Sequence, residues 1–531
     1  MAVPSTHEET LEQALGRVRE PLLVGRQAGS DLATLRELDP DTDSVTLDPA
    51  TAYVPACRLE DLGDPAFRTD HGVQYACVAG AMANGIASVE LVEAMAHAGM
   101  LGIFGAAGLP LGRVEHAVDR LQRSLGTSRP YGFNLIHSPG EPALEAAVAD
   151  LYLKRGVRLV EASAFLDLTL PIVRYRVKGL QRSGDGRIVA TNRVIAKVSR
   201  VEVATKFLAP APDRFLRELL NRGEITPDQA EWASRMPLAD DLTAEADSGG
   251  HTDNQPAIVL IPTMIALRDR LRREFGYESV PRVGAAGGIS TPWAVAGALA
   301  MGASYLVTGS INQACVESGT SDTVRKMLAE ARQADIAMAP AADMFEMGVK
   351  VQVLKRGTMF AMRAARLYEL YRAYDRLEAI PEADRATLEK TIFRLPLETV
   401  WAQTQAFFRE RDPAQIERGL RDPKHKMALV FRWYLGQSSA WANAGEPSRA
   451  IDYQVWCGPA MAAFNEWVRG SFLEEPAARR AGLVSLNLLH GAAVLARARS
   501  LALQGVALPP GVPRLAPLTA TELEPHLARS L

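Results

Sequence analysis

The stretch Val283-Gly-Ala-Ala-Gly-Gly-Ile-Ser-Thr-Pro292, followed by Ala303-Ser-Tyr-Leu-Val-Thr-Gly-Ser-Ile311, is the most informative part of the sequence. Each half runs from a short apolar segment into small residues, Gly287-Gly288 in the first and Gly309-Ser310 in the second. Glycine lets backbone N–H groups approach an anion because no Cβ stands in the way. In (β/α)₈ barrels the loops after strands seven and eight form the usual phosphate site. We therefore expect a phosphate cradle here, the alternative being glycines that only permit tight turns.

Outward from this stretch, eight short apolar runs alternate with helix-like segments from about residue 72. Such alternation indicates repeated βα units, and eight strands over roughly 250 residues favour a closed barrel over an open doubly wound sheet. The predicted strands are 73–79, 101–104, 131–136, 158–162, 193–198, 238–245, 281–286 and 305–308. The predicted helices between them are 88–98, 111–125, 141–155, 169–180, 203–222, 262–275 and 292–301.

Two segments depart from the repeat: 181–192 is expected to be a hairpin-like insertion and 221–237 a helix-like excursion. Insertions on βα loops usually shape a substrate entrance. We expect a polar leader with one short helix over 1–45, the barrel over 46–357 and a helical region over 358–531. Its predicted helices are 359–377, 382–393, 397–408, 412–420 and 481–503. The fold class is therefore α/β, a (β/α)₈ TIM barrel with βα-loop insertions and a C-terminal helical appendage.

The composition limits the classes of binding partner that we expect. The formal net charge of -3 over 531 residues gives no global field toward nucleic acid or anionic lipid, so an acidic partner would need a local basic patch. The four cysteines are far apart in sequence, which favours neither a metal site nor a disulfide framework. The N-terminus lacks a signal-peptide pattern, and the longest apolar run, 294–307, is shorter than the ~20 residues of a membrane helix. We expect a soluble, cytoplasmic protein without metal, nucleic-acid or membrane partners.

The second chemical signal is Glu245-Ala-Asp-Ser-Gly-Gly-His-Thr-Asp-Asn254 at the end of the sixth predicted strand. Gly249 and Gly250 would let the loop press against a flat ring while the imidazole of His251 reaches over it. An isolated histidine is more often a surface or core residue. Its position at the carboxyl end of a barrel strand favours a catalytic role.

Two weaker signals flank these motifs. The loop 80–87 contains Ala83-Asn84-Gly85, whose small residues would allow backbone contact with a planar cofactor. Asn134, in the third strand, could bond a ring edge or phosphate, or only satisfy a backbone group. Lys197 and Glu161, near the ends of the fifth and fourth strands, should share one mouth, either to orient substrate and cofactor or as a buried ion pair.

The joint placement of these motifs over about residues 72–320 resembles the nitronate monooxygenase and flavin-dependent enoyl-ACP reductase superfamily. Four segments resemble the PfaD-like proteins of polyunsaturated fatty acid and polyketide synthesis more closely: the segment 245–254 quoted above, Thr308-Gly-Ser-Ile-Asn-Gln-Ala314, Met344-Phe-Glu-Met-Gly-Val-Lys-Val-Gln-Val-Leu-Lys355 and, in the C-terminal part, Trp433-Tyr-Leu-Gly-Gln-Ser-Ser439. This likeness covers nearly the whole chain. One departure is Asp247-Ser248, where smaller superfamily members usually have Glu-Ala.

The resemblance implies a trans-acting enoyl reductase that moves hydride from NADPH through FMN to an enoyl thioester on acyl carrier protein domains of a synthase; a homodimer is compatible with it. The cofactor-binding candidates are Ala83, Asn84, Gly85, Asn134, Lys197, Gly249, Gly250, Gly287, Gly288, Gly309 and Ser310, and the catalytic candidates are His251 and Lys197. No Gly-x-Gly-x-x-Gly follows a strand, so no separate Rossmann domain is expected. The alternatives are a nitronate monooxygenase-type oxidase with His251 as base and a noncatalytic synthase-docking scaffold.

Overall fold

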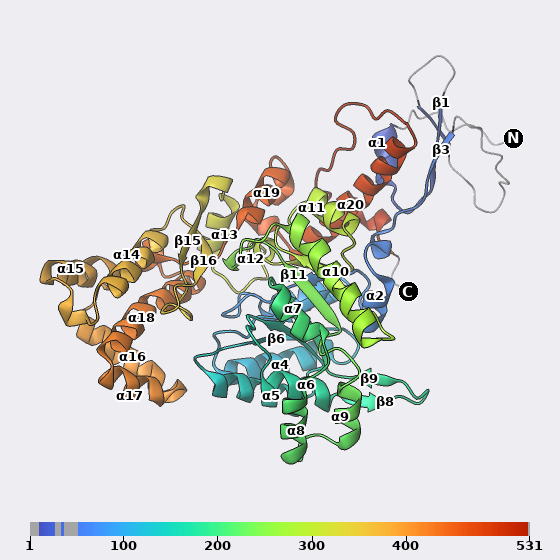
Figure 1. Cartoon of the computed structure of the whole chain (residues 1–531). Helices are drawn as coiled ribbons and strands as arrows, with labels where there is room; N and C mark the ends of the chain where they lie inside the picture. The colour runs from blue at the N-terminus through green and yellow to red at the C-terminus, as the bar shows by residue number, and fades with distance from the viewer. Residues whose placement is uncertain (1–9, 27–32, 37–50, 529–531) are drawn as a thin grey trace.

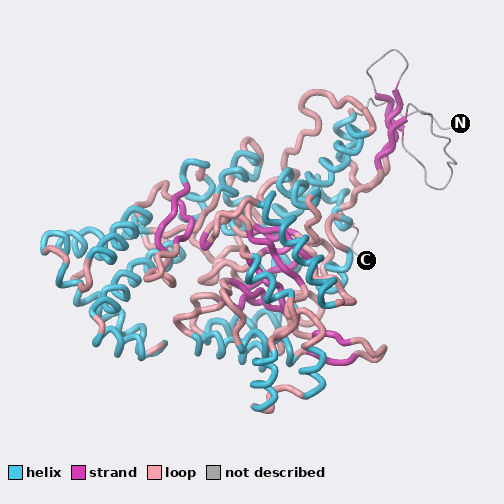
Figure 2. Tube along the Cα trace, viewed as in Figure 1, coloured by secondary structure: helices cyan, strands magenta, loops and turns pink. Residues whose placement is uncertain are grey.

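The computed structural model describes residues 10–26, 33–36 and 51–528. Eight parallel strands close into a barrel in the order β10-β11-β13-β14-β4-β5-β6-β7, which confirms the predicted TIM barrel. The strands are β4 (Cys77–Ala79), β5 (Leu101–Phe104), β6 (Gly132–Ile136), β7 (Leu159–Ser163), β10 (Arg193–Val198), β11 (Asp241–Glu245), β13 (Arg282–Ala286) and β14 (Leu306–Thr308). Figure 2 shows them gathered at the centre with helices around them.

Parallel pairing brings the carboxyl ends of the strands to one face. Asn134 on β6 pairs with Glu161 on β7, and Lys197 on β10 pairs with Thr243 on β11. Every barrel strand is wholly or largely buried, because helices cover the outside and side chains fill the inside. Residues near the carboxyl ends of β6, β7, β10 and β11 therefore meet at one opening, which we call the mouth.

A charged cluster closes the opposite, amino-terminal end of the barrel. His71, the last residue of α2 (Pro65–His71), lies 2.7 Å from the Asp241 carboxylate, and Arg282 binds that carboxylate at 2.5 Å. Asp70 accepts a second bond from Arg282 at 2.6 Å. Burial tends to raise the pKa of Asp241, but the neighbouring His71 and Arg282 outweigh it and hold the pKa below its usual value. Asp241 thus remains an ionised carboxylate in the fold.

The predicted helix 203–222 is wrong as a single helix. Two helices form, α7 (Val201–Leu208) and α8 (Asp213–Asn221). Pro210 and Pro212 lie between them, and proline removes a backbone donor and disfavours helical geometry in the residue before it. The other helices around the barrel are close to prediction: α3 (Val89–His97), α4 (Leu111–Leu125), α5 (Pro142–Arg155), α6 (Leu170–Lys178), α10 (Ala257–Phe275) and α11 (Pro292–Ala300).

The two irregular segments take the expected shapes: β8 (Leu180–Arg182) and β9 (Ile188–Ala190) form an antiparallel hairpin, and α9 (Pro227–Ala233) forms the excursion. The expectation that these insertions shape the entrance is wrong: α9 lies in the connection that leads from α8 into β11, and the hairpin lies in the connection that leads into β10. The hairpin follows α6 and precedes β10, and Arg158, just before β7, reaches Thr191 at its base. The hairpin therefore lies at the amino-terminal end of the barrel. The insertion at the mouth is instead 246–256, which contains the short strand β12 (Gly250–His251).

After the barrel, β15 (Ile336–Pro340) and β16 (Lys350–Leu354) form a hairpin, and β12 joins it as the third strand in the order β12-β16-β15. In Figure 1 this hairpin lies between the barrel and a lobe of orange helices. The lobe has its own apolar core and comprises α14 (Phe360–Ala373), α15 (Glu382–Thr387), a π-helical turn (Leu388–Phe393), α16 (Leu397–Arg411), α17 (Pro413–Arg421) and α18 (Pro423–Ala444). Neither the hairpin nor α18 was predicted.

The chain then returns to the barrel through α19 (Pro459–Val468) and α20 (Ala481–Leu503). The Cβ that Gly491 lacks would lie 2.6 Å from Pro292 Cγ, so glycine allows α20 to approach α11. Among the described residues α20 is the one helix long and apolar enough to span a membrane, but 72% of that stretch is buried inside the protein. Its apolar residues belong to the barrel's core cluster, whereas α14–α18 form another. The domain boundaries at residues 45 and 357 stay a prediction.

The described part of the N-terminal segment contains the predicted short helix, α1 (Leu11–Gly16). The rest differs from a polar leader, because β1 (Leu22–Arg26), β2 (Ala33–Arg36) and β3 (Thr51–Val54) form an antiparallel sheet. Leu15, Val18 and Leu22 are buried in the barrel's core cluster. This segment is therefore packed against the protein through its apolar residues. Residues 1–9, 27–32 and 37–45 of the predicted leader lie outside the described residues.

Candidate active site

One ammonium and two carboxylates meet in the mouth. Lys197 Nζ lies 3.2 Å from Glu245 Oε1 and 3.9 Å from Glu161 Oε2. The loop after β4 also contributes, because Ala81 N–H donates to Glu161 Oε2 at 3.1 Å. The structure thus brings Lys197 and Glu161 together as expected and forms the ion pair that was one of the two interpretations.

Burial and charge set the protonation of this cluster. Burial alone would lower the pKa of Lys197, but Glu245 and Glu161 outweigh it and raise that pKa above its usual value. Burial raises the pKa of Glu161, although Lys197 acts in the opposite direction. Lys197 therefore stays cationic over the physiological pH range and can donate hydrogen bonds to an oxygen that gains negative charge.

The loops after β13 and β14 contain open glycines. Gly288 has φ +76° and no atom within 4 Å of the place where a Cβ would stand, and the Cβ position of Gly309 is equally free. Ser310, half-buried, makes no side-chain hydrogen bond within the described part of the chain. Open backbone and a free hydroxyl at adjacent strand ends fit a phosphate group, as expected for the FMN phosphate.

The neighbouring glycine has a different role. A Cβ on Gly287, at φ +80°, would lie 2.5 Å from the Ala246 carbonyl and 2.8 Å from that of Asp247. This glycine therefore allows the turn after β13 to pass close to the turn after β11. Gly287 would therefore contribute to a cofactor site only by allowing this path of the backbone.

The Gly-Gly-His loop packs against a segment from the far C-terminus. A Cβ on Gly249 would meet the backbone nitrogens of Cys457 and Gly458 at 3.0 Å, and the Cβ position of Gly250 is 3.9 Å from Trp456 Cγ. Gln352 on β16 donates to Asp247 Oδ1 at 2.9 Å. Close packing of this loop thus explains the glycines at positions 249 and 250, whether or not a planar cofactor ring binds there. The loop is fixed by residues that lie outside the eight barrel strands.

The side chain of His251 is partly covered, with 40% of its surface accessible, and has a carboxylate partner. Its Nε2 lies 3.0 Å from Oδ1 of Asp343, in the connection between β15 and β16. Burial tends to lower the pKa of His251, but the bond to Asp343 outweighs it and raises that pKa above its usual value. Glu245 and Lys197 also act on the imidazole electrostatically, in opposite directions, which relates His251 to the same mouth.

Two candidate side chains are occupied by the protein itself. Asn84, at φ 58° in a loop with Ala83 and Gly85, donates from Nδ2 to Ser439 Oγ on α18 at 3.0 Å. Asn134 Nδ2 donates to the Glu161 carbonyl at 3.0 Å and to a serine hydroxyl on β7. The Oδ1 atom of Asn134 accepts no hydrogen bond from the described residues, so an acceptor remains for a ligand.

The sequence reasoning missed three contributors: Asp343, Gln352 and Ser439. A signal existed for the strand that carries Gln352, because Val349, Val351 and Val353 alternate as in a half-buried strand. No local sequence pattern relates Asp343 to His251. Within the described residues, no group of three or more His, Cys, Asp or Glu side chains is placed to hold a metal ion.

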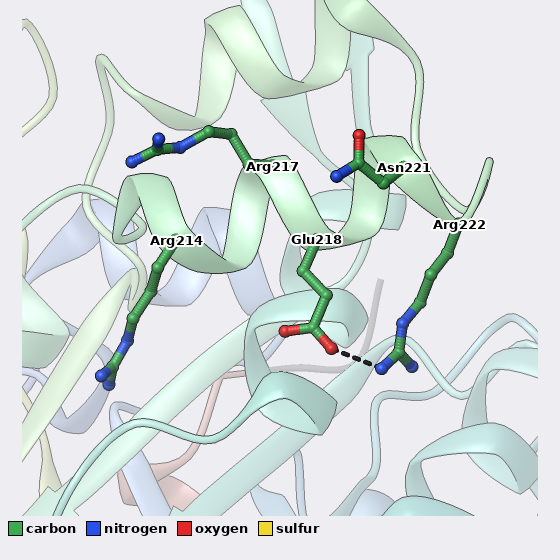
Figure 3. Close-up of a pocket in the computed structure, with 5 residues that line it drawn as sticks. All are labelled: Arg214, Arg217, Glu218, Asn221 and Arg222. Carbon is green, nitrogen blue, oxygen red and sulfur yellow. Dashed lines mark hydrogen bonds and ion pairs between the residues drawn. The ribbon is translucent and has the colours of Figure 1, made fainter.

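A shallow basic surface lies on α8, separate from the mouth's charged cluster. Figure 3 shows Arg214, Arg217 and Arg222 extending from it, with Glu218 paired to Arg222. Asp167, in the loop after β7, binds Lys206 at 2.8 Å and lies 4.0 Å from Arg214. Arg214 in the first turn of α8 therefore reaches a loop that follows a barrel strand, although α8 itself belongs to the connection from α7 to β11.

The fold and site define a (β/α)₈-barrel protein with open glycines after its last two strands and a charged mouth. The family model described as nitronate monooxygenase matches residues 66–369, and one described as the inserted helical domain of [acyl-carrier-protein] S-malonyltransferase matches 374–453. The chain therefore belongs to the nitronate monooxygenase family, in its PfaD-like group.

Named relatives cover both parts of the chain. It is 51% identical over 94% of its length to a polyunsaturated fatty acid synthase protein of Thraustochytrium sp. and 45% identical over 83% to the polyketide biosynthesis protein PksE of Bacillus subtilis. The chain spans 33% and 57% of those two proteins. The crystal structure of the enoyl reductase domain of MlnA from Bacillus amyloliquefaciens matches with 39% identity and a TM-score of 0.79, over 83% of this chain and 99% of that domain.

Proposed function

We propose that the protein is a trans-acting, FMN-dependent enoyl reductase that uses NADPH to reduce the α,β-double bond of an enoyl thioester on an acyl carrier protein. The observation that carries the proposal is the open cradle at Gly288, Gly309 and Ser310 beside a mouth that contains Lys197 and the His251 loop. The match along 99% of the MlnA enoyl reductase domain supports the reaction class.

The residues have separable roles in this reaction. The backbone at Gly288 and Gly309, with the Ser310 hydroxyl, would hold the FMN phosphate. FMN, when bound, supplies hydride transfer from NADPH to the β-carbon of the substrate. Lys197 stabilises the negative charge that develops on the thioester oxygen, and His251 donates the proton that the α-carbon takes up.

The carrier protein is proposed to dock through an acidic face on the basic surface of α8. Arg214, Arg217 and Arg222 project from this surface, and one acidic side chain, Glu218, lies among them. Arg214 lies beside the loop after β7, so a carrier bound there would deliver its thioester from the rim of the barrel. The relatives named for fatty acid and polyketide synthesis support a place beside a synthase, and we propose that this place is in the cytoplasm.

The test is a substrate-resolved assay on the purified, full-length protein. We expect a flavin spectrum, release of FMN on heating, and NADPH oxidation that depends on an enoyl thioester attached to a carrier protein. The family also contains oxidases, so oxygen uptake with a nitronate is measured in parallel. Nitronate-dependent oxygen uptake without enoyl-dependent NADPH oxidation would contradict the proposal. A colourless protein that cannot be reconstituted would favour a scaffold.

A further inference from the structure

His251 and Asp343 are held facing one another by a single small sheet. His251 ends β12, which pairs with β16 so that His251 lies opposite Val351. Asp343 lies in the connection that joins β15 to β16, and its Oδ1 is 3.0 Å from His251 Nε2. The two residues are 92 positions apart in sequence. Their contact therefore depends on the insertion of β12 as a third strand beside the hairpin.

We propose that Asp343 is a positioning residue for His251: its carboxylate accepts the Nε2 proton, fixes the orientation of the ring and leaves Nδ1 as the nitrogen available to the substrate. An ionised carboxylate can only accept hydrogen bonds, so Nε2 must carry the proton. Nδ1 makes no hydrogen bond to the described residues. The contact between His251 and Asp343 comes from the structure. The reaction in which Nδ1 would take part rests on the proposed function.

The charges around the pair favour the protonated ring. Asp343 is the strongest favourable influence on the imidazolium, and Glu245 adds to it. Burial and Lys197 act against it. On the carboxylate side, His251 and Arg432 together outweigh burial and hold the pKa of Asp343 below its usual value. Asp343 is thus ionised wherever His251 titrates.

The sign of the pH effect follows from this arrangement. Because the pKa of His251 is raised, the imidazolium persists to higher pH and is lost as the pH rises through that pKa. The proton-donating form is therefore available near neutral pH. Without the carboxylate, the largest favourable influence on the imidazolium would be gone, and the same form would be lost at lower pH.

The backbone of the loop is held independently of Asp343. Gln352 binds Asp247, and the chain at Gly249 packs against Cys457 and Gly458. Asp343 itself is about half exposed, with 48% of its side-chain surface accessible. Replacing Asp343 by asparagine should consequently remove a charge without displacing the loop or unfolding the protein.

The first test is an NMR pH titration of the imidazoles in histidine-labelled holoenzyme, with the His251 signal identified by its loss in His251→Gln. We expect Asp343→Asn to lower the pKa of His251 by about 1–3 units, the range for an opposite charge at this distance. Asp343→Glu should restore most of the shift. Asp253→Asn is the matched control, because it removes a carboxylate two residues from His251 that pairs with Arg200 instead.

A second measurement separates this inference from the proposed function. Stopped-flow reoxidation of the reduced enzyme by a carrier-bound enoyl thioester should lose rate at high pH, and in Asp343→Asn that loss should move down by the same amount as the NMR pKa. An unchanged His251 pKa in Asp343→Asn would overturn the inference whatever the reaction is. A lowered pKa in a protein that shows no enoyl-dependent reoxidation would support the dyad and refute the enoyl reductase.

Discussion

Lys197 and Glu245 face each other across neighbouring strands, with Nζ 3.2 Å from Oε1. Because Glu161 adds a second carboxylate at 3.9 Å, Lys197 is held as a permanent cation. A permanent cation can stabilise developing negative charge, but it gives up a proton reluctantly. This assigns proton donation to His251 and charge stabilisation to Lys197 in the proposed reaction.

Lys197→Met should slow reoxidation by the enoyl thioester by roughly 10²-fold, the lower end of the effect of removing one donor to a developing oxyanion. Stopped-flow absorbance of the flavin is the measurement. Lys206→Met is the control, because Lys206 also pairs with a carboxylate, Asp167, but on an exposed surface. Unchanged reoxidation would show that Lys197 serves only the buried ion pair.

Gly309→Val should yield folded protein that is largely free of FMN. Its Cβ would meet no protein atom within 4 Å, so the substitution creates no direct clash at Cβ, yet the side chain would occupy the cradle. The ratio of flavin absorbance to protein after heat release measures the loss. Gly297→Val on α11, where a Cβ also meets nothing, should keep its flavin. Full flavin content in the Gly309 variant would refute the cradle.

His251→Ala should keep FMN, since the cradle is elsewhere, and lose the enoyl-dependent step. General acid–base groups contribute typically ~10²–10⁴-fold, so reoxidation should slow by at least ~10²-fold while reduction by NADPH changes little. The two half-reactions are followed separately by stopped flow. Equal slowing of both would mean that His251 shapes the flavin site in general, and no slowing would remove it from the catalytic residues.

Asp241→Asn should destabilise the barrel by about 1–3 kcal/mol, because Arg282 would lose its buried partner and keep only its bond to Asp70. Urea unfolding at pH 7 measures this, with Asp185→Asn in the exposed β8–β9 turn as the control. The lowered pKa of Asp241 also predicts a pH effect. The stability that ionised Asp241 contributes is complete above its pKa in the unfolded chain, about 3.9, and is lost as the pH falls through its lower pKa in the folded protein. The variant should therefore not show this part of the loss of stability in acid. A variant with the same acid loss as the natural protein would contradict this.

Arg217→Glu should raise the KM for a carrier-bound enoyl thioester roughly tenfold, the lower end of electrostatic steering effects. The KM for a small, carrier-free thioester should stay the same, because the mouth is untouched. Comparing the two substrates at low and high salt is the measurement. Arg187→Glu, which removes an exposed arginine from the β8–β9 hairpin instead of from α8, is the matched control. An equal change for both substrates would argue against docking on α8.

Much of the barrel could be predicted because its signals are local. Strand and helix periodicity is present in each short segment, so the strand ends at Ala286 and Thr308 were located within the sequence alone. The break between α7 and α8 was missed although Pro210 and Pro212 signal it. The helix α18 was missed because it is buried on several faces and shows no single apolar stripe.

Neighbouring residues are enough to specify the eight-stranded barrel, the glycines after its last two strands and the His251 motif, so these could be predicted without a structure. What each glycine does depends on the tertiary structure. Gly288 is open, whereas Gly249 is covered by Cys457, more than 200 residues away. The same holds for Asp343, which reaches His251 because β12 joins the sheet of β16. Backbone pairing between distant strands joins residues that no local pattern relates, so the partner of the histidine could come only from the fold.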